Sequence, residues 1–175
     1  MSNYEPIVPE NISSNSFEYH NVPMTVVSDS PGTYQGYYPA YLFFAKGQWG
    51  CTSTAAPPHF VGIKSDKTLI CDRYDFTVRW DLVAMTVKDF IIESSMDGET
   101  WKELYTGTVP FVATYSQECE FEPTICKYIR MKILTTYDTR GYKWVQGTNF
   151  KVYGTLANIR HLYTNNSAYG IRRET

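Results

Sequence analysis

The chain has 175 residues, which suits one domain with a large hydrophobic core that needs neither a metal nor disulfides to fold. Hydrophobic residues make up 43% of it, aromatic residues 16% and charged residues only 19%, which excludes a disordered chain, because such chains are poor in aromatics and rich in charge. The formal net charge of −2 leaves no basic excess for a phosphate backbone, so we expect no nucleic-acid partner.

Residues 1–20 contain clusters of proline, asparagine and serine and predict an extended N-terminal arm. The first residues have neither a basic region nor an apolar stretch, so no signal peptide is visible. No stretch approaches the roughly 18 apolar residues of a membrane span. The best run, 36–45, contains Pro39. We therefore expect no membrane span.

Period-2 alternation of side chains predicts the first strands of the domain. Pro57 and Pro58 precede a strand at 59–64. Further along, apolar and polar residues alternate, with Phe76, Val78 and Trp80 on one side and Thr77 and Arg79 on the other. Such a strand has one dry face and one wet face, so Trp80 is expected in the core.

A β-hairpin is predicted next. A strand at 90–95 meets Asp97-Gly98, and this dipeptide is a hairpin signal because glycine supplies the positive φ of a tight primed turn. The return strand is expected to carry Trp101, Leu104 and Tyr105. Pro110 then interrupts the stretch 106–115, which predicts an edge strand or a bulge.

The last two strands show the same alternation. In the strand at 127–134, apolar side chains point one way and polar ones the other, with Ile129, Met131 and Ile133 against Tyr128, Arg130 and Lys132. Phe150 and Val152 alternate with Lys151 and Tyr153 in the final strand. Many short strands separated by turns predict an all-β fold, a β-sandwich or jelly roll, over residues 21–154, followed by a polar tail at 155–175.

The four cysteines, Cys51, Cys71, Cys119 and Cys126, form neither a CxxC pair nor a zinc-site spacing. Their even number permits two disulfides, of which a Cys119–Cys126 bond is the most plausible, because Pro123 would turn the chain between them. The favoured interpretation is four buried thiols that act as small hydrophobes. Nearby, three glutamates alternate along one face of a strand: Glu118, Glu120 and Glu122. This pattern favours a solvated face over a metal site.

Five stretches follow one another in a familiar order: YPAYLFFAKGQW (38–49), PHFVGIK (58–64), KDFIIESSMDGETW (88–101), KYIRMKI (127–133) and NFKVYG (149–154). The hairpin motif at 93–101 is the most specific of them. In this order they resemble the discoidin, or coagulation factor 5/8 type C, domain family. The resemblance covers about residues 21–154 and implies a galactose-binding-like jelly roll, non-catalytic as a class, with loops at one end that bind sugars, lipid headgroups or proteins.

Two features depart from the family pattern. Many members carry an acidic segment near a structural calcium, but here that place reads Leu42-Phe-Phe-Ala-Lys-Gly47, without a carboxylate. We therefore expect no cofactor, and a calcium site at this place is doubtful. The terminal cysteine pair of many extracellular members is also absent.

Sugar binding needs flat aromatic faces and fixed hydrogen-bonding groups in a largely apolar recess. Two loops have this composition: Tyr34, Tyr37 and Tyr38 in the first, and Tyr137, Asp138, Arg140, Tyr142 and Trp144 in the second. In the family's topology, these loops can lie at the same end of the sandwich. The resemblance also implies a sugar-reading role for Arg79, although an ordinary ion pair with Asp81 or Asp75 explains it equally well. Packing beneath the loops is the alternative for the aromatic residues.

An enzyme is not indicated. The histidines, His20, His59 and His161, lie far apart in the sequence, and none belongs to a motif. No nucleophile elbow, HExxH zinc motif or phosphate loop occurs in the sequence. His59 follows a proline at the start of a strand, where a structural role is the more common one.

The first hypothesis is a non-catalytic carbohydrate-binding or adhesion module whose partners are glycans or glycoproteins, held weakly by each copy. The second is a structural subunit of a larger assembly, such as a virion or a surface appendage, in which the arm at 1–20 and the tail at 155–175 dock on neighbouring subunits or on other copies of the chain. Both hypotheses place the domain outside the cell, at a cell surface or on a virion.

Overall fold

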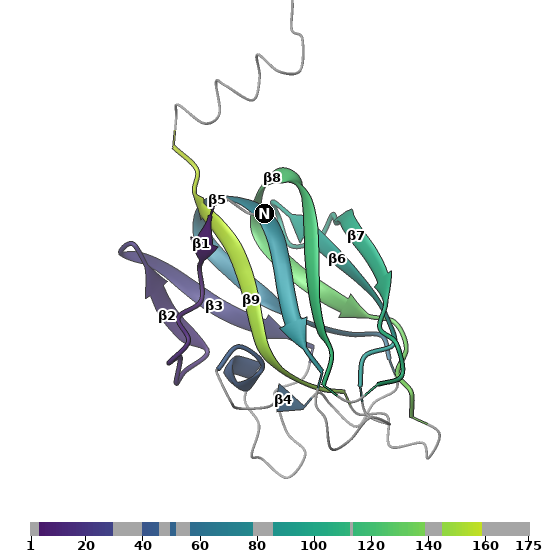
Figure 1. Cartoon of the computed structure of the whole chain (residues 1–175). Coiled ribbons are helices and arrows are strands. Elements are labelled where there is room, and N and C mark those ends of the chain that lie inside the picture. Colours follow the sequence, from purple (N-terminus) through teal and green to yellow (C-terminus); the bar gives the residue numbers. More distant parts are fainter. Residues whose placement is uncertain are drawn as a thin grey trace, which may run out of the picture.

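The computed structural model describes residues 4–29, 40–45, 50–51, 57–78, 86–112, 114–138 and 145–158. These residues form nine strands and one short 3₁₀ helix, η1 (Figure 1). The elements are β1 (Glu5–Pro6), β2 (Ser16–Tyr19), β3 (Val22–Ser28), η1 (Ala40–Phe43), β4 (Gly50–Cys51), β5 (His59–Thr77), β6 (Asp89–Ser95), β7 (Lys102–Thr108), β8 (Ser116–Ile133) and β9 (Gln146–Leu156). All strand pairs are antiparallel, which confirms the predicted all-β fold.

The two longest strands, β5 and β8, each belong to two layers. The first part of β5, up to Lys64, pairs with β3 and with the end of β8. From Leu69 onward, β5 pairs with β9 and with the beginning of β8. One layer therefore has the order β2-β3-β5-β8-β6-β7, and the other has the order β1-β9-β5-β8. Figure 1 shows β8 curving over between its two halves.

Aromatic side chains fill the space between the layers. The ring of Phe76 on β5 lies 5.1 Å from that of Phe90 on β6 and 5.6 Å from that of Phe150 on β9. The buried hydroxyl of Tyr74 donates to the carbonyl of Val61 at 3.1 Å, which joins the two halves of β5 across the core. The predicted alternation is confirmed, with one face buried: Phe76, Val78, Ile129, Met131, Ile133, Phe150 and Val152. Trp80 lies outside the described residues.

The hairpin of β6 and β7 is confirmed, but its turn is wider than predicted. The paired positions end at Ser94 and Lys102, so Trp101 precedes the return strand. Gly98 has a φ of +83°, as a turn glycine should. An Asp97 oxygen accepts hydrogen bonds from two backbone N–H groups of the loop. These bonds replace the hydrogen bonds between strands that a tighter turn would make, which explains the wider turn.

The N-terminal segment contributes strands to the sandwich. β1 pairs with β9, and β2 forms a hairpin with β3 whose turn residues, His20 and Asn21, both have positive φ. Ile7, Val8 and Ile12 are buried in the core. Residues before 21 therefore pack onto the domain, while the division into arm, domain and tail stays a prediction.

Cys71, Cys119 and Cys126 are free and buried, as the favoured interpretation predicts, and the Cys119–Cys126 bond considered beside it is wrong. Cys119 and Cys126 both lie on β8, which continues through Pro123 instead of reversing there. The register of β8 against β5 shifts around this proline, which bends the strand without closing it on itself. Cys126 instead faces Cys71 on β5, and the two Sγ atoms lie 3.9 Å apart. The side chain of Cys51 lies outside the described residues.

Candidate functional site

The strand ends that border residues 30–39, 79–85 and 139–144 gather at one end of the sandwich. Asp29, just after β3, donates its backbone N–H to the carbonyl of Phe60 near the start of β5. The last residue of β5, Thr77, pairs with the first of β8, Ser116. The last residue of β8 pairs with His59 and with β6. We call this end of the sandwich the loop end.

An exposed aromatic surface lies at the loop end. Phe111 is 60% exposed and Val112 is 45% exposed. The ring of Phe111 lies 4.8 Å from that of Tyr137, at an interplanar angle of 58°. The Tyr137 hydroxyl donates to the carbonyl of Val109 at 2.7 Å, which fixes its ring. Tyr137 thus supports Phe111, and we call Phe111, Val112 and Tyr137 the loop-end platform.

Charged groups border the platform. The ammonium group of Lys88 lies 5.6 Å from the centre of the Tyr137 ring, a cation–π distance. Asp138 follows Tyr137, and its backbone N–H donates to the hydroxyl of Thr136 at 3.4 Å. The platform therefore combines apolar rings with a cation and a carboxylate, which is the composition of a small polar-ligand site.

Asp89 holds the strands beneath the platform together. Its two carboxylate oxygens accept hydrogen bonds from the hydroxyls of Thr108 and Thr135, at 2.8 and 2.5 Å. These bonds, that of Thr135 first, lower the pKa of Asp89 because they favour the charged carboxylate. Asp89 thereby connects β6 and β7 to the segment that leads into Tyr137.

His59 has the structural surroundings that its sequence position predicts. Its side chain is buried, and its Nδ1 lies 2.8 Å from an Asp29 carboxylate oxygen. The other carboxylate oxygen accepts the backbone N–H of Phe60 at 3.0 Å. The pair connects the end of β3 to the start of β5.

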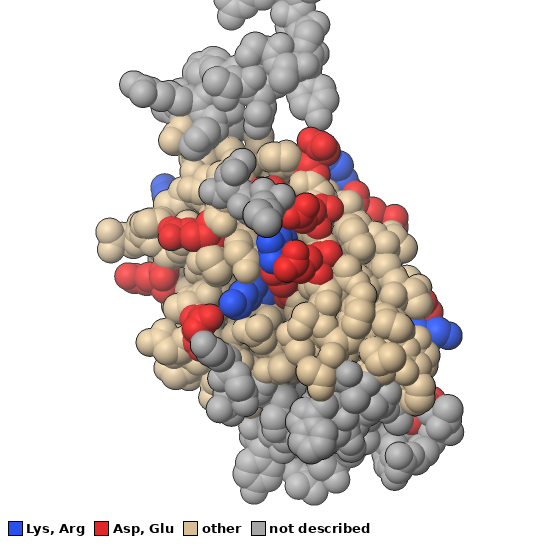
Figure 2. Space-filling model, in the orientation of Figure 1, with Lys and Arg blue, Asp and Glu red and all other residues tan. Residues whose placement is uncertain are grey.

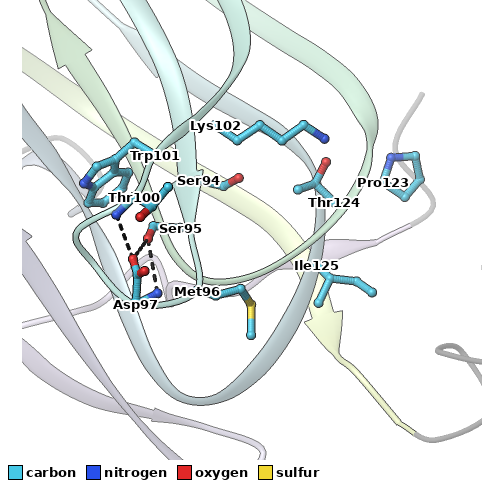
Figure 3. Close-up of a pocket in the computed structure, with 10 residues that line it drawn as sticks. All are labelled: Ser94, Ser95, Met96, Asp97, Thr100, Trp101, Lys102, Pro123, Thr124 and Ile125. Atoms are coloured by element: carbon cyan, nitrogen blue, oxygen red, sulfur yellow. Dashed lines mark hydrogen bonds between the residues drawn. The ribbon is translucent and has the colours of Figure 1, made fainter.

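A recess of about 480 Å³ lies at the opposite end of the sandwich, between the β6–β7 loop and β8 (Figure 3). Asp97 is directed back into its own loop, where it accepts the hydroxyl of Ser95 and two backbone N–H groups. The ring of Trp101 is covered by the guanidinium of Arg130, 3.4 Å from its centre. Arg130 in turn pairs with the buried Glu93. These side chains stabilise the hairpin.

Of the predicted site residues, the structure describes Tyr137 and Asp138, which it places together at the loop end. The others lie outside the described residues: Tyr34, Tyr37, Tyr38, Arg79, Arg140, Tyr142 and Trp144. Sequence reasoning missed Phe111. The available signal was two adjacent large apolar residues directly after Pro110, where an edge strand ends.

The described part of the doubtful calcium segment does not fit a calcium ion. Phe43, Phe44 and Ala45 are buried apolar side chains in and after η1, whereas calcium takes oxygen ligands. No cluster of three or more histidine, cysteine, aspartate or glutamate residues suited to a metal occurs in the part of the chain that the structure describes. Within the same residues, no helix is long and apolar enough to cross a membrane.

The sequence between residues 23 and 160 matches the F5/8 type C domain family. No curated protein matches the chain. Among solved structures, CpGH89CBM32-5 from Clostridium perfringens, in complex with GalNAc-β-1,3-galactose, has a TM-score of 0.62 and 13% identity, over 74% of this chain and 94% of that one.

Two further solved structures from the same organism are similar. CBM32-3 of a family 31 glycoside hydrolase has a TM-score of 0.61 and 20% identity, over 75% of this chain and 91% of that one. The family 32 carbohydrate-binding module of NanJ, in complex with galactose, has a TM-score of 0.59 and 16% identity, over 74% and 93%. At identities this low, the structural similarity shows a shared fold and nothing about the ligand.

Proposed function

Because the chain belongs to the F5/8 type C domain family, we propose that it is a non-catalytic carbohydrate-binding module that recognises glycans of cell surfaces at its loop end. The observation that carries the proposal is the loop-end platform, where Phe111 is exposed and held against a fixed tyrosine ring. The fold shared with carbohydrate-binding modules supports it.

The platform offers what a sugar ring requires. One face of a pyranose presents C–H groups, which pack on an aromatic ring as other apolar surfaces do. The hydroxyls at its edge need donors and acceptors; the ammonium of Lys88 is a donor beside the ring, and Asp138, next in sequence to Tyr137, carries a carboxylate acceptor. A ring that is already fixed loses little conformational entropy on binding.

Two carboxylates at this end, those of Asp89 and Asp29, have structural roles, which supports binding over catalysis. Asp89 accepts two threonine hydroxyls, and Asp29 binds His59 and a backbone N–H group. Both side chains therefore hold strand ends in place. The alternative role as a structural subunit of an assembly remains a prediction, as does docking through residues 1–20 and 155–175.

Galactose and GalNAc are the first probes, because two of the similar modules were solved with galactose or with a GalNAc-galactose disaccharide. We expect Phe111→Ala to weaken retention on immobilised galactosides and a printed glycan array by about fivefold or more, since loss of a stacking ring costs about 1–3 kcal/mol. Because the side chain is exposed, the unfolding free energy should change by no more than about 0.5 kcal/mol.

Met96→Ala is the matched control, because Met96 is a large apolar residue, 49% exposed, in the loop at the opposite end. It should leave retention unchanged. Retention should also be equal with calcium and with EDTA, as expected where residues 42–45 offer no carboxylate. Equal retention by the Phe111→Ala variant and the unchanged chain would contradict the proposed site, and no retention on any glycan would contradict the function.

A further inference from the structure

The outward face of the β9–β5–β8 layer carries a second group of polar side chains, away from the loop-end platform. Residues two apart on a strand share a face. The register therefore aligns Tyr153 with Arg73 in one row and Lys151, Asp75 and Glu118 in the next, closer to the loop end. Figure 2 shows positive and negative side chains interspersed on this face.

The surface is hollowed between these rows. A groove of about 260 Å³ runs over β9, β5 and β8, and its lining is mostly polar. At its loop-end side, the hydroxyls of Thr77 and Ser116 lie 3.0 Å apart. Successive rows lie two residues apart along a strand, and each residue advances about 3.3 Å, so three rows extend over about 13 Å, longer than one pyranose ring. We call this feature the polar groove.

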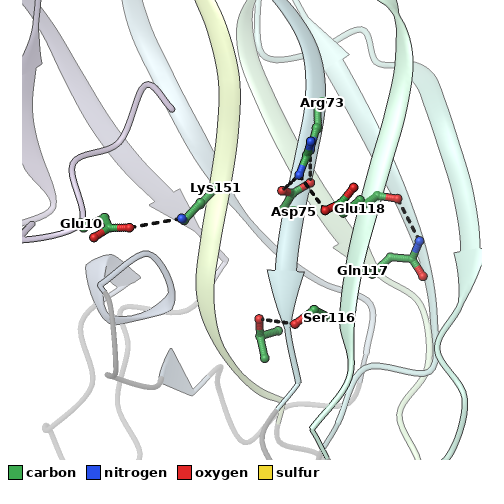
Figure 4. A network of polar contacts seen from close by, with 8 residues as sticks. Glu10, Arg73, Asp75, Ser116, Gln117, Glu118 and Lys151 are labelled. Carbon is green, nitrogen blue, oxygen red and sulfur yellow. Dashed lines mark hydrogen bonds and ion pairs between the residues drawn. The ribbon is translucent and has the colours of Figure 1, made fainter. Parts of the chain in front are cut away.

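A guanidinium held by ion pairs lies between the first two rows of the polar groove (Figure 4). Arg73 donates from Nε and Nη2 to the two oxygens of Asp75, at 2.7 and 2.5 Å, and its Nη2 lies 3.0 Å from Glu118. Its guanidinium also lies 4.6 Å from the centre of the Tyr153 ring. The side chains of Arg73 and Asp75 are each only 14% exposed. A side chain fixed in this way loses little entropy when a ligand binds.

Asn149 is the residue that points to a ligand. It sits in a β-bulge, because Asp75 pairs with Lys151 while Thr77 pairs with Thr148, which leaves one extra residue on β9. Its φ is +54°, a left-handed conformation that is uncommon outside glycine. Its side chain lines the groove, and no hydrogen bond of its amide is found within the part of the chain that the structure describes. Bulges re-aim side chains and occur often beside binding sites.

We propose that the polar groove is a second saccharide-binding site, which takes a neutral oligosaccharide lying along the strands. Its charged side chains are paired: Arg73 with Asp75 and Glu118, and Lys151 with Glu10 at 3.2 Å, which leaves one negative charge in excess and disfavours an acidic ligand. An ionic ligand would have to break these pairs. Sugar hydroxyls both donate and accept, so they bind such paired groups without separating them.

The amide of Asn149, the Thr77–Ser116 hydroxyls and the ring of Tyr153 would complete the contacts along the chain of sugars. The polar groove shares no residue with the loop-end platform. The two sites can therefore be tested separately, and either one can fail without the other.

The test is a titration of the ¹⁵N-labelled full chain with three neutral tetrasaccharides, chitotetraose, cellotetraose and mannotetraose, and with tetragalacturonate as the acidic comparison, each to about 10 mM. At least one neutral tetrasaccharide should shift the backbone amides of Asp75 and Thr77 and the side-chain amide of Asn149. Tetragalacturonate should bind at least tenfold more weakly.

Asn149→Gly should weaken this binding about tenfold, because it removes hydrogen bonds to the sugar. Glycine accepts a positive φ, so the bulge is kept. Asn21→Gly is the matched control: Asn21 also has a positive φ, +61°, but lies in the β2–β3 turn. It should have no effect on binding, and neither should Phe111→Ala. Thr77→Val, which keeps the shape of the side chain and removes its hydroxyl, should weaken binding severalfold.

The proposal is overturned if no neutral tetrasaccharide shifts these amides, or if Asn149→Gly and Thr77→Val both bind as the unchanged chain does. Binding of tetragalacturonate as tight as that of the neutral sugars would overturn the assigned ligand class. Loss of galactoside retention in Phe111→Ala, with tetrasaccharide binding kept, would support both sites. Unchanged galactoside retention in Phe111→Ala, with tetrasaccharide binding kept there and weakened in Asn149→Gly, would support the polar groove alone.

Discussion

At the scale of single residues, Asp97 shows how one exposed carboxylate orders a loop. Its carboxylate accepts the backbone N–H groups of Thr100 and Glu99, both at 2.8 Å, and the hydroxyl of Ser95 at 2.9 Å. These bonds, with that of Thr100 the largest contribution, lower the pKa of Asp97 to about 2 from a usual value of 3.8.

We therefore predict an acid-sensitive contribution from this loop. A folded-state pKa below the unfolded one means that the contribution is complete above about pH 3.8 and is lost as the pH falls towards 2. Asp97→Asn should flatten the fall in melting temperature over this window, measured by circular dichroism. Asp66→Asn, at an exposed aspartate of β5, should not. If the melting temperature of Asp97→Asn fell with pH as steeply as that of the unchanged chain, the Asp97 carboxylate would not contribute to the acid sensitivity.

The buried thiols belong to the same scale. Cys71 and Cys126 lie side by side in the core, and burial and their mutual hydrogen bond, the bond first, raise the pKa of Cys71 well above its usual value. Burial likewise raises the pKa of Cys119. A neutral thiol is a poor nucleophile, so these residues act as small hydrophobic side chains in the fold.

At the scale of elements, Arg130 joins the β6–β7 hairpin to β8. It pairs with Glu93, whose side chain is 5% exposed, and lies between the rings of Phe60 and Trp101, 4.5 and 3.4 Å from their centres. The wet face that the alternation predicts for Arg130 is therefore covered by aromatic rings.

We predict that Arg130→Met destabilises the domain by about 3–5 kcal/mol, because it leaves the Glu93 carboxylate buried without a counter-charge. Urea unfolding monitored by tryptophan fluorescence measures the loss. The double variant Arg130→Met/Glu93→Leu should recover most of it, since it removes the uncompensated charge. If the double variant were as unstable as the single one, packing on Trp101 would be the main contribution of Arg130.

At the scale of the whole molecule, the strand ends that border residues 30–39, 79–85 and 139–144 meet at one end, and the polar groove lies on one face. A single small sugar-binding site, such as the loop-end platform, binds weakly, because sugar hydroxyls are already well hydrated and little area is buried. Useful retention then depends on several copies acting together.

We predict that four biotinylated copies on streptavidin are retained on a galactoside surface at least a hundredfold longer than one copy, because later contacts form at high effective concentration. Surface plasmon resonance at low and high ligand density measures this difference. A tetramer of the Phe111→Ala variant is the control and should lose the gain. Equal retention of one copy and four would argue against surface glycans as the ligand.

Part of the candidate site followed from the sequence, and part did not. Tyr137 and Asp138 stand in a loop rich in aromatic and polar residues, a local signal. For Phe111 the sequence offers only a pair of large apolar residues after Pro110, and their role depends on contact with Tyr137, which lies on a different connection. The glutamates at 118, 120 and 122 are exposed, as predicted, yet the pairing of Glu118 with Arg73 depends on the register of β5 against β8.

The sequence by itself determined that this chain is built of strands, which side of each strand is buried and where the β6–β7 hairpin lies. These are local properties, since side chains alternate between faces with a period of two. Tertiary structure alone decided that β5 and β8 pass through both layers, that residues before 21 join the sheet and that Asn149 falls in a bulge. The physical reason is that register and folding-over depend on contacts between distant strands, and a shift of one residue in register moves every side chain to the opposite face.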